Sequence, residues 1–277
     1  MSRTRRTPRR RGIRWGNLLI VLIAVIGAAG LAWWGAYGIS SRPGNDQPAP
    51  AQSEPQPPPP AARQNPTSGQ PAEPDEPEPE PIDHSADWRL ILASPASPVG
   101  YEFTPPELED VQGFWVDSRI AQPLREMIAA AASDGVELMV VSGYRPAYRQ
   151  RELHYRQIER FMGYGQSRAE AVATASTIVL PPGTSEHQTG LAVDIVTPAH
   201  QMLNDYFADT PAGRWLAENS WRHGFNLRYP RDSMHITGVI FEPWHFRYVG
   251  REHAQAMFEG GYVFECYLRD VLGVAIP

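Results

Sequence analysis

The stretch Ser185–Val196, SEHQTGLAVDIV, carries the clearest structural signal in this sequence of 277 residues. Its second half is rich in β-branched residues and follows a glycine, which is typical of a short and largely buried strand. Because side chains alternate across a strand, Ala192 and Asp194 share one face, and the small alanine leaves room there for a ligand. Gly190 permits a tight turn that brings His187 back over the same face.

A second histidine, His245, follows farther along the chain in the segment EPWH at 242–245. Two imidazoles and one carboxylate suit a catalytic zinc ion, which takes three protein ligands and leaves a fourth position for water. The sequence therefore predicts that His187, Asp194 and His245 bind one zinc ion per chain. Glu242 is the expected base for a proton of that water. Each residue alone has a plainer explanation, as a loop, capping or core residue, but the combination favours a metal site.

The N-terminal part of the chain has the pattern of a membrane anchor. Residues 1–16 contain seven arginines and no acid, and residues 17–39 follow without a charge. An apolar run of about 22 residues reaches across a bilayer core, and the arginines before it favour a cytoplasmic N-terminus. A cleaved signal peptide is the alternative, but the run is long for one and lacks a clear small-x-small site. We therefore expect a single-pass protein of the cell membrane, with its folded domain outside the cytoplasm.

Residues 40–86 form a predicted disordered linker between this anchor and a folded domain. Half of the chain's 28 prolines and eight acids fall in the segment, which has almost nothing apolar to bury. Residues 87–277 suffice for one domain and carry a net charge of −7, which argues against a nucleic-acid partner. Cys266 is the only cysteine, so the sequence allows neither an internal disulfide nor a cysteine metal cluster.

Hydrophobic periodicity in the domain predicts a mixture of helices and strands. Helices are expected over 120–132, 146–162, from 211 onward, and over 250–258 and 263–272. Strands are expected over 88–92, 136–141, 191–196, 225–229 and 239–249. The last strand is interrupted at Pro243, which cannot donate a ladder hydrogen bond and therefore needs an edge or a bulge.

Three short motifs are spread over this domain. They are Ser142-Gly143-Tyr144-Arg145 with Gln150, Ser185-x-His187-x-x-Gly190-x-Ala192-x-Asp194, and Glu242-x-Trp244-His245. The set resembles the VanY-type D-alanyl-D-alanine carboxypeptidases, which belong to a wider group with lysostaphin-like peptidases and hedgehog signalling domains. The resemblance covers about 87–272. It implies an α+β fold of hedgehog and D-Ala-D-Ala-peptidase type, a small antiparallel sheet flanked by helices, here preceded by one transmembrane helix and a disordered linker.

The resemblance also implies a role for each motif residue. The residues already expected at the metal site match the family's zinc ligands and catalytic base. Arg145 matches the family's arginine, which is expected to face either the scissile carbonyl or the terminal carboxylate of the substrate. Gln150 and Ser185 match positions near the substrate terminus. The implied substrate is a peptidoglycan stem peptide that ends in D-alanine.

The expected function is a membrane-anchored zinc D,D-carboxypeptidase that removes the terminal D-alanine from such stems. An L,D-carboxypeptidase acting on tetrapeptide stems, or a peptidoglycan endopeptidase, carries the same motifs, so both stay open. A further alternative is a zinc-containing module that binds cell-wall peptides without cutting them. Glu242 argues against this module, because a site that only binds has no use for a base three residues before a ligand.

Overall fold

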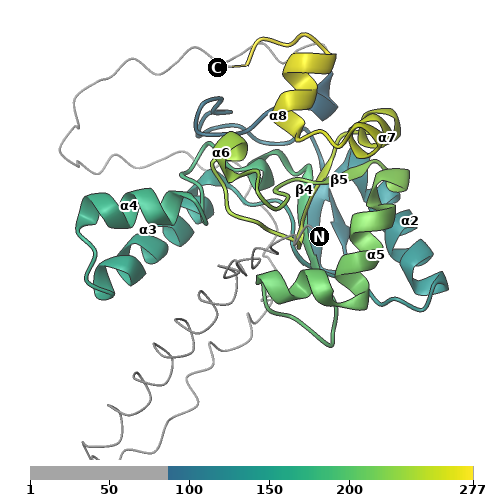
Figure 1. Ribbon diagram of the computed structural model, residues 1–277, viewed down its shortest axis with the longest axis horizontal. Coiled ribbons are helices and arrows are strands. Elements are labelled where there is room, and N and C mark those ends of the chain that lie inside the picture. The colour runs from purple at the N-terminus through teal and green to yellow at the C-terminus, as the bar shows by residue number, and fades with distance from the viewer. Residues whose placement is uncertain (1–86, 277) are drawn as a thin grey trace, which may run out of the picture. The chain divides into compact units, whose positions relative to one another are not determined.

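The strand expected in the middle of the chain is β4 (Ala192–Val196) of the computed structural model, which describes residues 87–276 (Figure 1). It lies inside a four-stranded sheet between β3 (Met139–Ser142) and β6 (His245–Tyr248). Strand β5 (Phe225–Leu227) pairs with β6 at the far edge. Every neighbouring pair is antiparallel. With a partner on each side, β4 is buried along its whole length.

A separate hairpin precedes this sheet in the chain. Strands β1 (Leu108–Val111) and β2 (Phe114–Asp117) pair antiparallel across the two-residue turn at Gln112 and Gly113. Both turn residues have positive φ, 55° and 87°, which matches the twist of a tight hairpin. Helix α2 (Ser118–Ser133) begins directly after β2.

The apolar core lies between α2, the hairpin and one face of the four-stranded sheet. Ile120, Leu124 and Met127 recur at helical spacing on α2 and are fully buried. Val193 and Ile195 contribute to the same core from β4. Burying an apolar side chain of this size stabilises a fold by about 1.5–3 kcal/mol. The opposite face of β4 carries Ala192, Asp194 and Val196, and Asp194 is its polar residue.

The other helical segments surround the sheet. Helices α3 (Ala147–Gly163) and α4 (Arg168–Ser176) lie side by side at one side of the domain, away from α2 and α5 (Figure 1). The longer segments that remain are α5 (Pro211–Asn219) and α7 (Arg251–Gly260). The short ones are η1 (Trp88–Leu90), η2 (Glu186–Thr189), η3 (Asp205–Asp209), η4 (Ser220–His223), α6 (Met234–Thr237), α8 (Phe264–Cys266) and the π-helical η5 (Tyr267–Val271).

The structure confirms the expected α+β class, a small antiparallel sheet flanked by helices, for the described residues. The helices expected over 120–132, 146–162 and 250–258 are present as α2, α3 and α7, and α5 begins at Pro211. The strands expected over 136–141, 191–196 and 225–229 are present with shifted ends. The last expected helix begins as α8 and continues as η5.

Two strand predictions are wrong in part or entirely. The strand expected over 88–92 is absent there, because Trp88–Leu90 forms η1, whose first turn is capped by the Asp87 carboxylate. The strand expected over 239–249 shrinks to β6, because a tight turn precedes it, in which the backbone N–H of His245 donates to the carbonyl of Glu242 at 3.1 Å.

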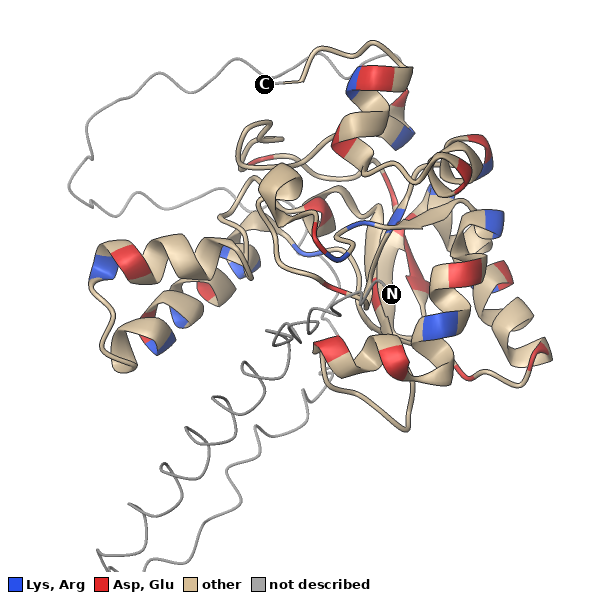
Figure 2. Ribbon diagram, viewed as in Figure 1, with Lys and Arg blue, Asp and Glu red and all other residues tan. Residues whose placement is uncertain are grey.

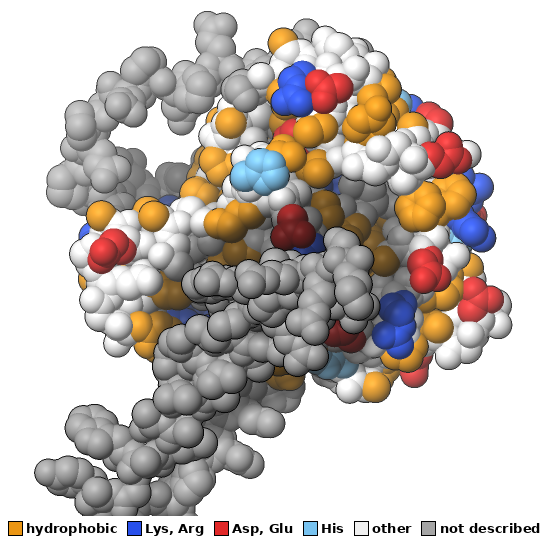
Figure 3. Space-filling view, viewed as in Figure 1, with side chains coloured by type: hydrophobic (Ala, Val, Ile, Leu, Met, Phe, Trp, Pro, Cys, Tyr) orange, Lys and Arg blue, Asp and Glu red, His pale blue; other side chains and the backbone are white. Residues whose placement is uncertain are grey.

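Three sequence-based expectations fall on residues outside the described part of the chain. These are the cytoplasmic basic segment 1–16, the transmembrane anchor 17–39 and the linker 40–86. Within residues 87–276, none of the helices combines the length and the apolar character that a bilayer crossing requires. In that range, arginines and acids are interspersed along the outer helices, and the face drawn in Figure 3 mixes both signs with apolar side chains (Figures 2 and 3).

Candidate active site

Three elements bring the expected metal ligands together. His187 belongs to η2, Asp194 to β4 and His245 to the first position of β6, directly opposite Asp194 in the sheet register. Gly190 ends η2 with φ of 70°, and a Cβ at this residue meets the Asp117 backbone nitrogen at 2.8 Å. Glycine is therefore required here both for the backbone conformation and for space.

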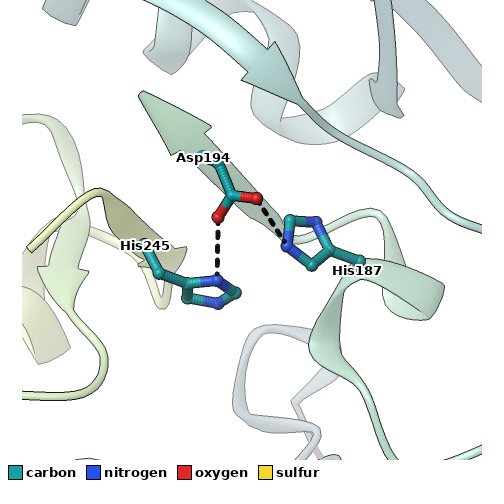
Figure 4. A group of neighbouring side chains, drawn as sticks. All are labelled: His187, Asp194 and His245. Atoms are coloured by element: carbon teal, nitrogen blue, oxygen red, sulfur yellow. Dashed lines mark hydrogen bonds and ion pairs between the residues drawn. The ribbon is translucent and has the colours of Figure 1, made fainter. Parts of the chain in front are cut away.

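The ligand atoms of these three side chains converge on one point (Figure 4). His187 Nε2 lies 3.2 Å from Asp194 Oδ2, and His245 Nδ1 lies 3.1 Å from Asp194 Oδ1. One atom from each residue falls within a group less than 4.8 Å across, and all three residues are buried. A tetrahedral zinc with bonds of about 2.0–2.1 Å separates its ligands by roughly 3.4 Å. The donor set and its spacing therefore fit one zinc ion.

The hydrogen bond at Nδ1 of His187 fixes the orientation and the tautomer of this ring. His187 Nδ1 lies 2.8 Å from the backbone carbonyl of Gly143, which can only accept, so the ring donates there and its Nε2 lone pair points to the metal position. Gly143 lies at the end of β3 against β2, where a Cβ meets the Trp115 carbonyl oxygen. The glycine of the Ser-Gly-Tyr-Arg motif thus allows the close approach that places this acceptor.

Charge is distributed unevenly between the two histidines. Burial and the nearby Arg145 charge lower the pKa of His187, which keeps the ring neutral. Burial also opposes a charge on His245, but hydrogen bonding to Asp194 and the surrounding carboxylates raise its pKa to about 9. Burial opposes the charge of Asp194, but the hydrogen bond and the charge of the protonated His245 help to hold the pKa of Asp194 well below its usual range. A metal that binds here therefore displaces a proton from His245.

Glu242 lies beside this group. Its Oε2 is 3.7 Å from His245 Nδ1, and its backbone N–H donates to the carbonyl of Tyr229 at 3.1 Å. Burial is the main cause that raises the pKa of Glu242 to about 8, and the Asp194 charge adds to it, while His245 and Arg145 act in the opposite direction. A carboxyl group with this pKa can both accept and release a proton near neutral pH.

Arg145 approaches the metal ligands from the start of α3. Its Nη2 lies 3.7 Å from Asp194 Oδ2 and donates to Ser142 Oγ at 2.7 Å, while Nη1 donates to Gln150 Oε1 at 3.0 Å. Gln150 is itself held by a 2.6 Å hydrogen bond from its amide to the Leu180 carbonyl. Gln150 therefore orients the guanidinium of Arg145. The sequence predicted only that Gln150 lies near the substrate terminus.

The remaining sequence-predicted residue, Ser185, directly precedes η2 and is buried, and its side chain does not cap that helix. It stands two positions before His187 in the chain, and its predicted place near the substrate terminus stays a prediction. The five other histidines of the described domain are not members of the metal-ligand group; they are His154, His200, His223, His235 and His253.

Sequence reasoning missed a cluster of buried charges behind His245. Glu186, Arg228, Arg247 and Glu265 are all buried, and their side chains bond to one another. One signal could have indicated it. Arg247 stands two positions after His245 in an expected strand, so its side chain had to share the face of the metal ligand.

The fold and the site together define an α+β domain with a buried zinc site made of two histidines and one aspartate. Residues 113–251, half of the chain, match the family model described as VanY, D-alanyl-D-alanine carboxypeptidase. The chain belongs to this family.

Known relatives agree with this assignment. A D-alanyl-D-alanine carboxypeptidase of Enterococcus faecalis is 42% identical over 184 residues, 66% of this chain and 66% of that protein. A solved structure of the D,D-pentapeptidase VanY in complex with Zn(II) matches with a TM-score of 0.60 at 42% identity, covering 66% of this chain and 99% of that one. VanYB in complex with D-alanine-D-alanine gives 0.60 at 41% identity over 66% and 98% of the chains. The LdcB LD-carboxypeptidase gives 0.58 at 30% identity over 66% and 86%.

Proposed function

We propose that this chain is a zinc D,D-carboxypeptidase that removes the terminal D-alanine from peptidoglycan stem peptides. The observation that supports this most is the position of Arg145, an oriented and partly buried guanidinium whose Nη2 lies 3.7 Å from the carboxylate of the metal ligand Asp194. A planar guanidinium recognises a carboxylate through two parallel hydrogen bonds, which is the contact that a carboxypeptidase needs at the end of its substrate.

A proton route is available within the site. When zinc is bound, it supplies an acidified water and polarises the scissile carbonyl. Glu242 accepts the proton as that water attacks, since the positive charge of the cation favours its ionised form. The same carboxyl group then returns the proton to the departing amine nitrogen of D-alanine. Burial raises the pKa of this carboxyl group above its usual range, opposite to the effect of the cation, and so favours its reprotonation before this second step.

Arg145 takes part from the other side of the ligand group. Its guanidinium is held by Ser142 and Gln150 at fixed distances, so it needs little reorganisation when an anion arrives. Burial lowers the pKa of Arg145, while the nearby Asp194 and Glu242 charges counteract that effect. In a domain of net charge −7, this cation also offsets the repulsion of an anionic peptide end.

The products of three substrates test this reaction. Stem pentapeptide, stem tetrapeptide and a cross-linked dimer are each incubated with the zinc-loaded protein, and the products are read by mass spectrometry. The proposal expects loss of one D-alanine from the pentapeptide alone. Loss of the fourth residue from the tetrapeptide indicates the L,D-carboxypeptidase, which the match to LdcB keeps as the second candidate. Cleavage of the dimer indicates an endopeptidase, and binding without cleavage indicates the non-catalytic module.

We also propose that residues 17–39 anchor the protein in the cell membrane as a single span, with the N-terminus in the cytoplasm and the peptidase domain outside. The support is the sequence pattern of seven arginines before an uncharged apolar run. Protease added to intact spheroplasts should cut within 40–86 and release a fragment of about the size of residues 87–277. A fragment that stays protected from protease contradicts this orientation.

A further inference from the structure

Four buried charged side chains lie behind the metal-ligand group. Glu186 Oε1 accepts from Arg228 Nε at 2.8 Å and from Arg247 Nη1 at 2.9 Å. Arg228 also makes a two-pronged contact with the carboxylate of Glu265 in α8, at 2.6 and 2.9 Å. Two acids and two arginines give the cluster no net charge. Each of the three residues Glu186, Arg228 and Arg247 is at most 1% exposed.

The second oxygen of Glu186 points elsewhere. Glu186 Oε2 and His245 Nε2 are both buried, and neither has a hydrogen-bond partner within the described part of the chain. These two atoms lie 3.8 Å apart. A buried polar atom without a partner destabilises a fold, so two complementary ones side by side call for an explanation.

We propose that Glu186 is a positioning residue of the zinc site, with Oε2 as the acceptor for the Nε2–H of His245. This inference rests on the proposed function, because it takes His245 as a zinc ligand. A proton held on Nε2 leaves the Nδ1 lone pair free, and Nδ1 is the atom that faces Asp194 at 3.1 Å. Ligand histidines commonly donate their second N–H to a carboxylate or carbonyl in this way.

The two histidines then use equivalent arrangements with different acceptors. His187 donates to a backbone carbonyl at 2.8 Å, whose place is fixed by the chain. His245 faces a carboxylate whose place is fixed by two guanidinium groups on its other oxygen. Those arginines neutralise Glu186, so its charge is balanced without a proton, and they prevent it from turning toward the metal as a fourth ligand.

The cluster offers a matched control for this role. Glu265 is also a buried acid bonded to Arg228, but it contacts Nη1 and Nη2 of that guanidinium, whereas Glu186 contacts Nε. Removing the charge of either acid leaves Arg228 with one carboxylate, and Glu186→Gln also removes the carboxylate partner of Arg247. A purely structural role therefore predicts that Glu186→Gln lowers the stability more than Glu265→Gln, with zinc affinity equal in the two variants. A positioning role predicts that only Glu186→Gln lowers the affinity for zinc.

Zinc affinity of the full chain, measured by competition with a chelator, is the primary test. Glu186→Gln should bind zinc 10–100-fold more weakly than the unsubstituted protein, the range seen for lost outer contacts of ligands. Glu265→Gln should change affinity less than about 3-fold, although both variants lower the thermal midpoint. Equal zinc affinity in the two variants overturns the proposal and leaves Glu186 as a structural ion pair.

A second measurement needs no variant and covers the case in which Glu186→Gln does not fold. Nitrogen-15 NMR of the zinc-loaded protein should show His245 protonated at Nε2, with slow exchange of that proton, and bound to metal through Nδ1. Metal on Nε2, or a rapidly exchanging proton, refutes the role. If His245→Ala keeps its zinc, the proposed function fails as well; if it loses zinc while Glu186→Gln keeps it, only this inference fails.

Discussion

The two faces of β4 are equally buried but built from opposite chemistry. Val193 and Ile195 project into the apolar core, where burial stabilises the fold. Asp194 projects from the other face, and His245 and Arg247 of the paired strand share it. Charges buried there are costly unless they are paired. The difference indicates that the apolar face stabilises the fold, whereas the buried charges of the polar face lower its stability but form the metal site.

The largest effect is expected on metal binding. His187→Ala and His245→Ala should each lower zinc affinity by more than about 100-fold, beyond the loss from an outer contact, because water replaces an imidazole poorly. Both variants should purify nearly free of zinc and inactive. Glu242→Gln serves as the control, since it should retain zinc while losing activity. Metal analysis of the purified proteins decides, and full zinc content in both histidine variants rejects the ligand assignment.

The next effect concerns the free energy of unfolding of the zinc-free protein, which the buried carboxyl group of Glu242 lowers when it ionises. Its pKa is about 8 when folded, against an ordinary value of 4.5. The unfolded chain therefore ionises first as pH rises, and stability that is complete below pH 4.5 is lost progressively up to pH 8. Glu242→Gln should remove this loss and stabilise the zinc-free protein by roughly 3 kcal/mol at pH 7.

Chemical denaturation in the presence of a chelator measures this difference. At pH 4 the two zinc-free proteins should be equally stable. A variant that is less stable than the parent at pH 7 shows that Glu242 does not carry the burial cost assigned to it.

A smaller effect is expected at Arg145. Arg145→Lys keeps a positive charge but cannot reproduce the contacts to Ser142 and Gln150 together with a two-pronged contact to a carboxylate. The loss of one charge-assisted contact should cost about 2 kcal/mol of transition-state stabilisation, which lowers kcat/KM by a factor of about 30. The zinc content should not change. An unchanged kcat/KM in the lysine variant indicates that a point charge suffices and that the planar guanidinium is not needed to recognise the carboxylate.

The smallest effect should come from the apolar face. Ile195→Val removes one methylene from the core and should cost about 1 kcal/mol of unfolding free energy, with zinc affinity and kcat/KM as in the parent. Denaturant unfolding of the zinc-loaded protein gives the first quantity. If this substitution weakens zinc binding as strongly as the loss of an outer ligand contact does, the two faces of β4 are coupled and do not act separately.

The sequence predicted the metal site well because its geometry is mostly local. The distance from His187 to Asp194 is set by one turn and one strand, and the pairing of two strands adds His245. Glu242 lies in a tight turn three residues before that ligand. Alternation along a strand and the conformational freedom of glycine are therefore enough to place these groups.

Features made by distant residues were not predictable in the same way. Glu186 meets Arg228 42 residues away in the chain, and no periodicity marks either as a partner of the other. The β1–β2 hairpin was missed because its turn uses Gln112-Gly113 in place of the Asn-Gly or Asp-Gly that usually marks one. Residues 88–92 have strand-like composition, yet the Asp87 cap and burial of Leu92 in a separate cluster favour a turn.

If the polar face of β4 serves a carboxypeptidase, the site must recognise a free C-terminal carboxylate beside its metal. Turnover of the muramyl pentapeptide by the zinc-loaded protein is best compared between two forms, one with a free terminal carboxylate and one with that group amidated. Mass spectrometry should show release of a single D-alanine from the free form and no cleavage of the amidated one. Equal turnover of the two forms contradicts the account and favours an endopeptidase.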